Sequence, residues 1–210
     1  MAIFQGSSAA LYFDDGDKIW KTIADFLGDA PAAADRGTHA LRTILFTDIV
    51  SNTALLQLLG DAGWRAVLRE YERITRSQIT AHGGTEIKTT GDGFMASFGS
   101  AARALECAIA LQRAFDAHAT GEDHGVRVRI GLNAGEPIAE DDPGGRADLF
   151  GTAVTTAARI MGHAEGGEIL VADVVRQLVA GKGFEFADRG EIALRGFDDP
   201  TRVYRLRVPE

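Results

Sequence analysis

The sequence predicts an α+β fold with a ferredoxin-like β-α-β-β-α-β core, followed by a C-terminal extension. An apolar run at residues 42–49 shows little alternation, which is typical of a central strand covered on both faces. Two strand-like runs at 85–89 and 94–98 flank the turn Thr90-Gly91-Asp92-Gly93, which predicts a hairpin. Segments with helical spacing of apolar residues precede and follow this hairpin, and the resulting order is that of a split β-α-β unit.

The helices and the last strand of the core follow from the same kind of pattern. A helix is expected from about Asp61, which can act as its N-cap, to Gly83-Gly84, where two glycines end it. Ser100 can cap a second helix, whose apolar residues also keep helical spacing. Apolar residues alternate with polar ones such as Arg129 at 126–132, which predicts a half-buried strand.

A C-terminal extension follows this core. Residues 139–146 are polar and contain Pro-Gly-Gly, so they are expected to form a mobile loop or arm. A helix is expected near 151–163 and a strand at 168–171. Another helix and two or three short strands, ending near Tyr204, complete the predicted fold.

The first 40 residues differ in pattern from the rest of the chain. Residues 19–27 can form a short helix, and residues 31–37 have the alanine-rich, polar composition of a linker. We therefore expect an N-terminal segment and linker at 1–40, whose role the sequence does not show, and one main domain at 41–210.

Composition restricts the class of protein. The chain has 210 residues, 45% of them hydrophobic, which suits one globular domain with an appendage. Its formal net charge of −8 argues against attraction to nucleic acid or to an anionic membrane. No apolar run approaches the ~20 residues that span a bilayer, and the N-terminus lacks a signal-peptide pattern. The single cysteine, Cys107, is expected to pack within a helix, and the sequence as a whole predicts a cytoplasmic protein.

Two carboxylates are expected to meet at one end of the sheet. Asp48 ends the first strand, and Asp92 lies at the tip of the hairpin. A right-handed crossover brings this tip to the same end of the sheet as the C-terminus of the first strand. Two carboxylates there would form an oxygen-rich site for a hard cation such as magnesium, usually alongside substrate phosphates. The alternative, with Lys88 nearby, is an ordinary charged hairpin with a turn aspartate.

Three further stretches carry residues suited to phosphate, each with an ordinary structural alternative. The small polar segment that ends at Thr53 enters a helix, whose free N–H groups can bind phosphate, unless Asp48 simply caps that helix. Thr155 and Arg159 lie four residues apart and therefore on one helical face, which can bind phosphate or simply face solvent. Arg195, beside a glycine, is a weak indication when taken alone.

Together these stretches resemble the catalytic domain of class III nucleotidyl cyclases, and specifically of adenylyl cyclases. The resemblance extends from about Leu41 to the end of the chain, and it implies the class III cyclase fold. It also implies conversion of ATP to 3′,5′-cyclic AMP and pyrophosphate. The segments that match the cyclases in order and spacing are 46–50, 88–93, 148–159 and 194–197.

A separate resemblance concerns the N-terminal segment. Residues 9–28 resemble the last helix of an α/β-hydrolase, without a nucleophile elbow.

The cyclase resemblance implies a role for each residue around the two carboxylates. Asp48 and Asp92, assisted by the Ile49 carbonyl, would hold two magnesium or manganese ions per active site. These ions would activate the ribose 3′-hydroxyl and neutralise phosphate charge. Lys88 and Asp148 match the pair that selects the purine, because an ammonium can donate to adenine N1 and a carboxylate can accept from the 6-amino group.

The resemblance also implies where the phosphates bind and how the sites are assembled. Arg159 matches the arginine that stabilises the transition state, Arg195 would contact the terminal phosphates, and Thr53 belongs to the substrate-binding segment. The family pattern implies a homodimer with shared active sites at its interface. Each site would take its metal-binding aspartates from one subunit and its base- and phosphate-contacting residues from the other.

One position departs from the family pattern. The family usually has asparagine where this chain has Thr155, whose hydroxyl has a shorter reach than an amide. Loss of a preorganised transition-state donor costs about 10²–10³ in rate in other enzymes. Two alternatives to an adenylyl cyclase therefore stay open: a catalytically weak, cyclase-like module that binds nucleotide and regulates, and a guanylyl cyclase. Lys88 and Asp148 disfavour the guanylyl cyclase.

Overall fold

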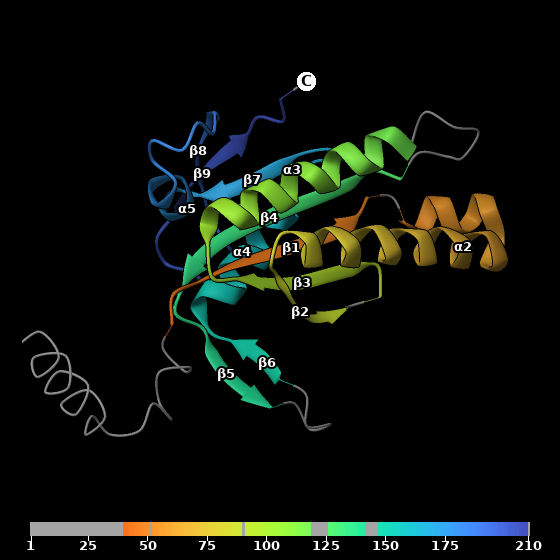
Figure 1. Ribbon diagram of the computed structural model, residues 1–210, viewed down its shortest axis with the longest axis horizontal. Coiled ribbons are helices and arrows are strands. Elements are labelled where there is room, and N and C mark those ends of the chain that lie inside the picture. The colour runs from red at the N-terminus through yellow and green to blue at the C-terminus, as the bar shows by residue number, and fades with distance from the viewer. Residues whose placement is uncertain (1–39, 51, 90, 119–125, 142–146, 210) are drawn as a thin grey trace, which may run out of the picture. The chain divides into compact units, whose positions relative to one another are not determined.

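The protein is described here by a computed structural model, shown in Figure 1. The helix expected at 19–27, the linker at 31–37 and the hydrolase-like stretch at 9–28 lie outside the residues that the structure describes. Those described residues are 40–50, 52–89, 91–118, 126–141 and 147–209.

A seven-stranded, mostly antiparallel sheet forms the centre of the domain (Figure 1). The first strand of the described residues, β1, lies inside the sheet and pairs antiparallel with β3 on one side and β4 on the other. This arrangement confirms the predicted core order. Along the sheet, the strands are β2 (Thr85–Thr89), β3 (Gly93–Phe98), β1 (Arg42–Ile49), β4 (Val128–Gly135), β7 (Ile169–Ala172), β9 (Thr201–Leu206) and β8 (Phe186–Ile192).

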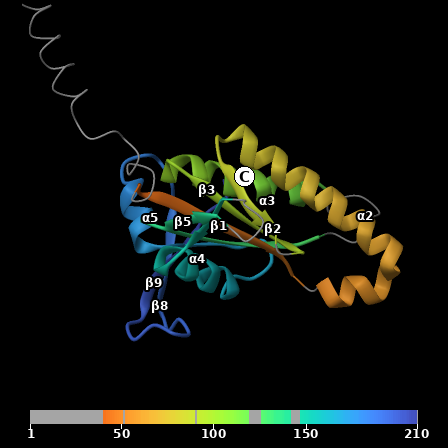
Figure 2. The same cartoon turned by 90° about the horizontal axis from the view of Figure 1, so that it is seen from below.

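Helices cover the sheet on both faces (Figure 2). Alternation along β1 divides its side chains between the two faces, so that Leu45 packs with the residues of α2 and α3 and Ile44 packs with those of α4. Both side chains are fully buried, as predicted for a central strand. The helices are α2 (Asn52–Ala81), α3 (Ala101–His118), α4 (Thr152–Gly162) and the short α5 (Asp173–Leu178).

A glycine lets α4 lie directly on the sheet. A Cβ atom at Gly131 of β4 would lie 2.3 Å from the backbone nitrogen of Met161 in α4, a distance that no side chain tolerates. Gly131 is the register partner of Phe46 on β1. The close approach therefore fixes α4 over the middle of the sheet, on the face to which Phe46 belongs.

The helix α2 begins earlier than predicted. The sequence placed its start at Asp61, whereas the structure begins it at Asn52 and interrupts it at Gly60, with φ 65° and ψ 176°. A left-handed φ is accessible to glycine at little cost, so the chain can change direction there and resume as a helix at Asp61. The residues at 52–59 are therefore a separate helical stretch that follows β1 directly.

A two-stranded arm flanks the stretch 142–146, where a mobile loop or arm was expected at 139–146. The strands β5 (Ile138–Asp141) and β6 (Ala147–Phe150) pair antiparallel, and the arm projects beyond one end of the main sheet (Figure 1). Alanine, glutamate and aspartate are uncommon in strands, which is why the pattern did not predict this pairing. The tip at 142–146 lies outside the described residues.

Cys107 packs in the core, as expected. Its side chain is fully buried within α3, and this burial raises the pKa of the thiol to about 12. Among the described residues, no helix is long and apolar enough to cross a membrane.

Candidate active site

Asp48 and Asp92 come together at the end of the central strands. Asp48 is the register partner of Gly93, the residue that follows Asp92. The backbone N–H of Ile49 also donates to the carbonyl oxygen of Asp92, at 3.3 Å. The two carboxylate-bearing residues therefore meet as predicted, with Asp48 on β1 and Asp92 in the turn directly before its neighbouring strand β3.

Arg129 is a neighbour of Asp48 that sequence reasoning did not single out. The two residues are register partners on β1 and β4. Nε of Arg129 donates to Oδ2 of Asp48 at 2.9 Å, and Nη2 donates to the same oxygen. Both side chains are partly buried. The only sequence signal was the alternation of Arg129 with apolar residues. This alternation predicts the face of the strand on which Arg129 lies, but not its partner residue on the neighbouring strand.

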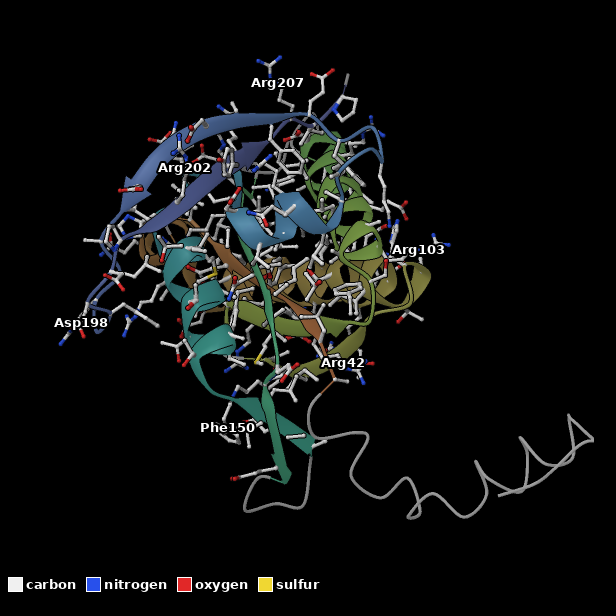
Figure 3. The ribbon with its side chains drawn as sticks, turned by 90° about the vertical axis from the view of Figure 1, so that its left-hand side faces the viewer. Arg42, Arg103, Phe150, Asp198, Arg202 and Arg207 are labelled. Atoms are coloured by element: carbon white, nitrogen blue, oxygen red, sulfur yellow. The ribbon has the colours of Figure 1, made fainter. Side chains whose placement is uncertain are left out.

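Lys88 and Asp148 form a direct ion pair between the sheet and the arm. Nζ of Lys88 donates to Oδ2 of Asp148 at 2.6 Å, and Nζ lies 5.3 Å from the ring centroid of Phe150. Asp148 is buried, and its Oδ1 accepts from the backbone N–H of Leu149 at 2.8 Å. Figure 3 shows Phe150 on the projecting arm, below α4. The two residues that resemble a purine-selecting pair are therefore adjacent within one chain.

Asp48, Lys88 and α4 share one face of the sheet. Phe46 and Met95 are register partners, and they pack with Val154 of α4. Asp48 lies two residues after Phe46 on β1, and Lys88 is the register partner of Met95 on β2. Since side chains alternate along a strand, Asp48 and Lys88 both project toward the α4 face.

Thr155 and Arg159 are both exposed on α4, one turn apart, as their spacing predicts. Oγ1 of Thr155 donates to the carbonyl oxygen of Gly151 at 3.2 Å, so its hydrogen is directed at its own helix. Within the described residues, Arg159 has no carboxylate at ion-pair distance. Its charge is therefore available to an anionic ligand.

Arg195 lies in the C-terminal part of the chain, whereas Thr53 lies five residues after Asp48. Arg195 is exposed in a turn closed by the N–H of Phe197 donating to the Leu194 carbonyl at 3.0 Å. Leu194 packs with Ile160, which follows Arg159 in α4. The backbone of Thr53 belongs to the first turn of α2, and its side chain is outside the described residues.

The oxygen donors around Asp48 suit a hard divalent cation. The candidate donors are two carboxylates and the Ile49 carbonyl, and no group of three or more His, Cys, Asp or Glu suited to a metal occurs in the described part of the chain. Such a sparse, all-oxygen set matches magnesium, which keeps several waters and relies on substrate phosphates for its remaining ligands. The guanidinium of Arg129 shows that Asp48 already attracts a positive group.

The chain matches one family of known proteins over most of its length. Residues 36–207 match the family described as the adenylate and guanylate cyclase catalytic domain. The chain belongs to this family. An adenylate cyclase of Podospora anserina is 30% identical over 231 residues, covering 85% of this chain and 11% of the fungal protein. One of Mycosarcoma maydis is 34% identical over 156 residues, covering 64% of this chain and 6% of that protein. This cyclase domain thus spans only a small part of such relatives.

Solved structures agree with the assignment to the cyclase family. The adenylyl cyclase CyaB from P. aeruginosa superposes with a TM-score of 0.74 at 25% identity, covering 81% of this chain and 95% of that one. An adenylate/guanylate cyclase/hydrolase from Silicibacter pomeroyi gives a TM-score of 0.71 at 32% identity, covering 82% of this chain and 98% of that one. The fold is therefore the mixed α+β fold of class III cyclases.

Proposed function

We propose that this cyclase-family chain is an adenylyl cyclase that converts ATP to 3′,5′-cyclic AMP and pyrophosphate. The observation that carries the proposal is the presence, on one face of the sheet, of both Asp48 beside Asp92 and the paired Lys88 and Asp148. The first pair suits a cation with phosphates, and the second suits a purine base. The comparisons support cyclase chemistry, and the choice of ATP rests on this second pair.

Asp48, Asp92 and the Ile49 carbonyl are the residues that would hold two magnesium or manganese ions. When bound, such ions lower the charge on the phosphates and favour the deprotonated ribose 3′-hydroxyl. A cation at Asp48 would compete with Arg129 for the same oxygen, Oδ2. Arg129 would then be free to turn its planar fork of donors toward the adjacent phosphates.

The other residues would position the substrate for attack of the 3′-oxygen on the α-phosphorus. Arg159, exposed and without a carboxylate partner among the described residues, would stabilise the negative charge that develops at the α-phosphate. Arg195 would contact the terminal phosphates that leave as pyrophosphate. The backbone at Thr53, at the start of α2, would offer N–H groups to the same phosphates.

Base selection would follow from the polarity of the Lys88–Asp148 pair. The Lys88 ammonium can donate to adenine N1, and the Asp148 carboxylate can accept from the 6-amino group. Guanine presents a donor at N1 and an acceptor at C6, which is the reverse pattern. ATP is therefore favoured over GTP.

A homodimer with shared sites is part of the proposal. The arm presents two large apolar side chains, Ile138 at 55% exposure and Phe150 at 41%, and these are register partners of each other. Two adjacent exposed apolar side chains on a projecting arm suit burial against a second copy of the chain. In such a dimer, Lys88, Asp148 and Arg159 of one subunit would complete the site begun by Asp48 and Asp92 of the other.

A catalytically weak nucleotide-binding module is the second candidate function. The position of Thr155 favours it, because the hydroxyl hydrogen is donated to the Gly151 carbonyl instead of pointing to a ligand. Retention of the two aspartates, the purine-selecting pair and Arg159 favours catalysis.

Incubation of the purified chain with Mn²⁺ and either ATP or GTP tests these alternatives. Cyclic AMP as the main product supports the proposal. Cyclic GMP as the main product would identify a guanylyl cyclase instead. Saturable nucleotide binding without cyclic product would favour the regulatory module. A chain that neither binds nor converts either nucleotide would contradict both candidate functions.

A further inference from the structure

A buried tyrosine lies behind the candidate cation site on the opposite face of the sheet. Tyr71 belongs to α2 and is 1% exposed. Its hydroxyl oxygen lies 2.5 Å from Oγ1 of Thr47, which is also 1% exposed. Thr47 directly precedes Asp48 on β1, and the two side chains project to opposite faces of the sheet.

The ring of Tyr71 also contacts the strand that follows Asp92. The rings of Tyr71 and Phe94 are arranged edge to face, with centroids 5.5 Å apart and an interplanar angle of 66°. Phe94 lies two residues after Asp92 and is the register partner of Thr47. One side chain of α2 thus contacts Thr47 on β1, the residue before Asp48, and Phe94 on β3, the strand that begins directly after Asp92.

The hydroxyl of Tyr71 is not explained by packing alone. A phenylalanine would fill the same space among Phe94 and Phe115 without the cost of burying a polar group. Burial raises the pKa of the phenol, the hydrogen bond with Thr47 lowers it in part, and the negative charges of Asp48 and Asp92 raise it further. The net shift is upward, so the hydroxyl is neutral across the physiological pH range.

We propose that Tyr71 is a positioning residue that aims the Asp48 carboxylate at the cation through its hydrogen bond to Thr47. The hydrogen bond holds the Thr47 side chain on the face of the sheet that α2 covers. It thereby fixes the rotation of β1 about the strand axis near its C-terminal end. That rotation sets the direction of the next side chain, Asp48, on the other face. Because ligands must be held within a fraction of an ångström, such support affects cation affinity. The inference rests on the proposed cation site but not on turnover.

A double-mutant cycle tests the proposal. Tyr71→Phe removes the hydroxyl and keeps the ring, and Thr47→Val removes the partner and keeps the β-branched shape. The dissociation constant for Mn²⁺ is read from the electron paramagnetic resonance signal of the free ion, without substrate. Each single variant should raise this constant about three- to tenfold, the range that one hydrogen bond is worth. The double variant should raise it no further, because the same bond is already lost.

Controls separate positioning from general stability. Tyr204→Phe removes the hydroxyl of a half-buried tyrosine on β9 and should leave Mn²⁺ binding unchanged. Thermal unfolding of every variant is measured in parallel. Loss of stability with unchanged Mn²⁺ affinity would overturn the proposal, as would additive effects in the double variant. A parent chain that binds no Mn²⁺ would also overturn it, whereas Mn²⁺ binding without cyclic product contradicts only the proposed function.

Discussion

Lys88 and Asp148 lie 60 residues apart in the sequence and are joined by a 2.6 Å hydrogen bond between Nζ and Oδ2. This bond connects β2 at the edge of the sheet to β6 of the arm. Asp148 is buried, so removal of Lys88 alone would leave a buried carboxylate without its cationic partner, which is costly. The pair therefore orients both polar groups before any nucleotide binds.

Reversing the polarity of this pair should change base preference. In Lys88→Glu with Asp148→Cys, the donor for adenine N1 becomes an acceptor and the acceptor for the amino group is lost. We expect kcat/KM for ATP to fall by about 10²-fold or more, since a site built to hydrogen-bond its substrate rejects mismatched groups strongly. Use of GTP should rise relative to ATP, measured as the ratio of the two kcat/KM values.

Glu86→Ala is the matched control for this change of base preference. Glu86 lies on the same strand as Lys88 but pairs with Arg76 of α2 on the other face. It should leave the ratio of ATP to GTP unchanged. If the double variant also keeps the parental preference, another surface selects the base.

Two inactive variants should complement each other if the sites are shared. Mixing Asp92→Ala with Lys88→Ala gives mixed dimers in which one of the two sites has all its residues. With random exchange in a twofold dimer, about a quarter of the parental activity should return. Cyclic AMP production is measured after exchange, which is verified with two different affinity tags.

The ion pair provides a control for the complementation experiment. Lys88 and Asp148 are bonded within one chain, so both residues belong to the same half of a shared site. A mixture of Lys88→Ala and Asp148→Ala should therefore recover no activity. Absence of recovery in the first mixture would indicate that each site is contained in one chain. Recovery in the second would instead mean that Lys88 and Asp148 reach a site from different subunits.

The sequence predicted the meeting of Asp48 and Asp92 because topology alone determines it. Once β1 and the hairpin were recognised, the hand of the crossover placed both residues at one end of the sheet. The exposed face shared by Thr155 and Arg159 followed from helical geometry in the same way. Such features depend on periodicity and connection, which the sequence contains.

Features that depend on register or on individual contacts were not predictable. Arg129 faces Asp48 because of the β1–β4 register, which no local pattern specifies. The hydrogen bond between Tyr71 and Thr47 depends on how α2 lies on the sheet. The break at Gly60 was missed because a single glycine can interrupt a helix or be tolerated within it, according to its surroundings.

Removal of either candidate metal ligand should abolish activity. Asp48→Ala and Asp92→Ala should each lower kcat by at least about 10²–10³, the cost of losing a single transition-state stabilising group in other enzymes. Because Asp48→Ala also leaves Arg129 without its partner, Asp48→Asn is added, which keeps the shape and can still accept a hydrogen bond. Cyclic AMP formation and thermal unfolding are measured for each variant.

Asp116→Ala controls for removal of an aspartate in general. Asp116 is exposed on α3, which covers the opposite face of the sheet from α4. It should retain parental activity. A folded Asp48→Ala or Asp48→Asn variant with near-parental turnover would contradict the role of Asp48 in cation binding.

Thr155 should act mainly in the transition state. Its hydroxyl now donates to the Gly151 carbonyl at 3.2 Å, but rotation about χ1 would direct it to a ligand on the face shared with Arg159. Thr155→Asn should hold or raise kcat, because an amide reaches farther than a hydroxyl. Thr155→Ala should lower kcat by more than it weakens ATP binding, which is the pattern of an interaction made only in the transition state.

Two further variants distinguish the Thr155 hydroxyl from the shape of the side chain. Thr155→Val keeps the branched shape and removes only the hydroxyl, so it should match Thr155→Ala in kcat. Thr152→Ala removes another exposed threonine of α4, three residues earlier, and should leave kcat unchanged. If Thr155→Val and Thr155→Ala both turn over like the parent, the hydroxyl stays on Gly151 throughout the reaction. The α-phosphate would then be stabilised by Arg159 without help from this position.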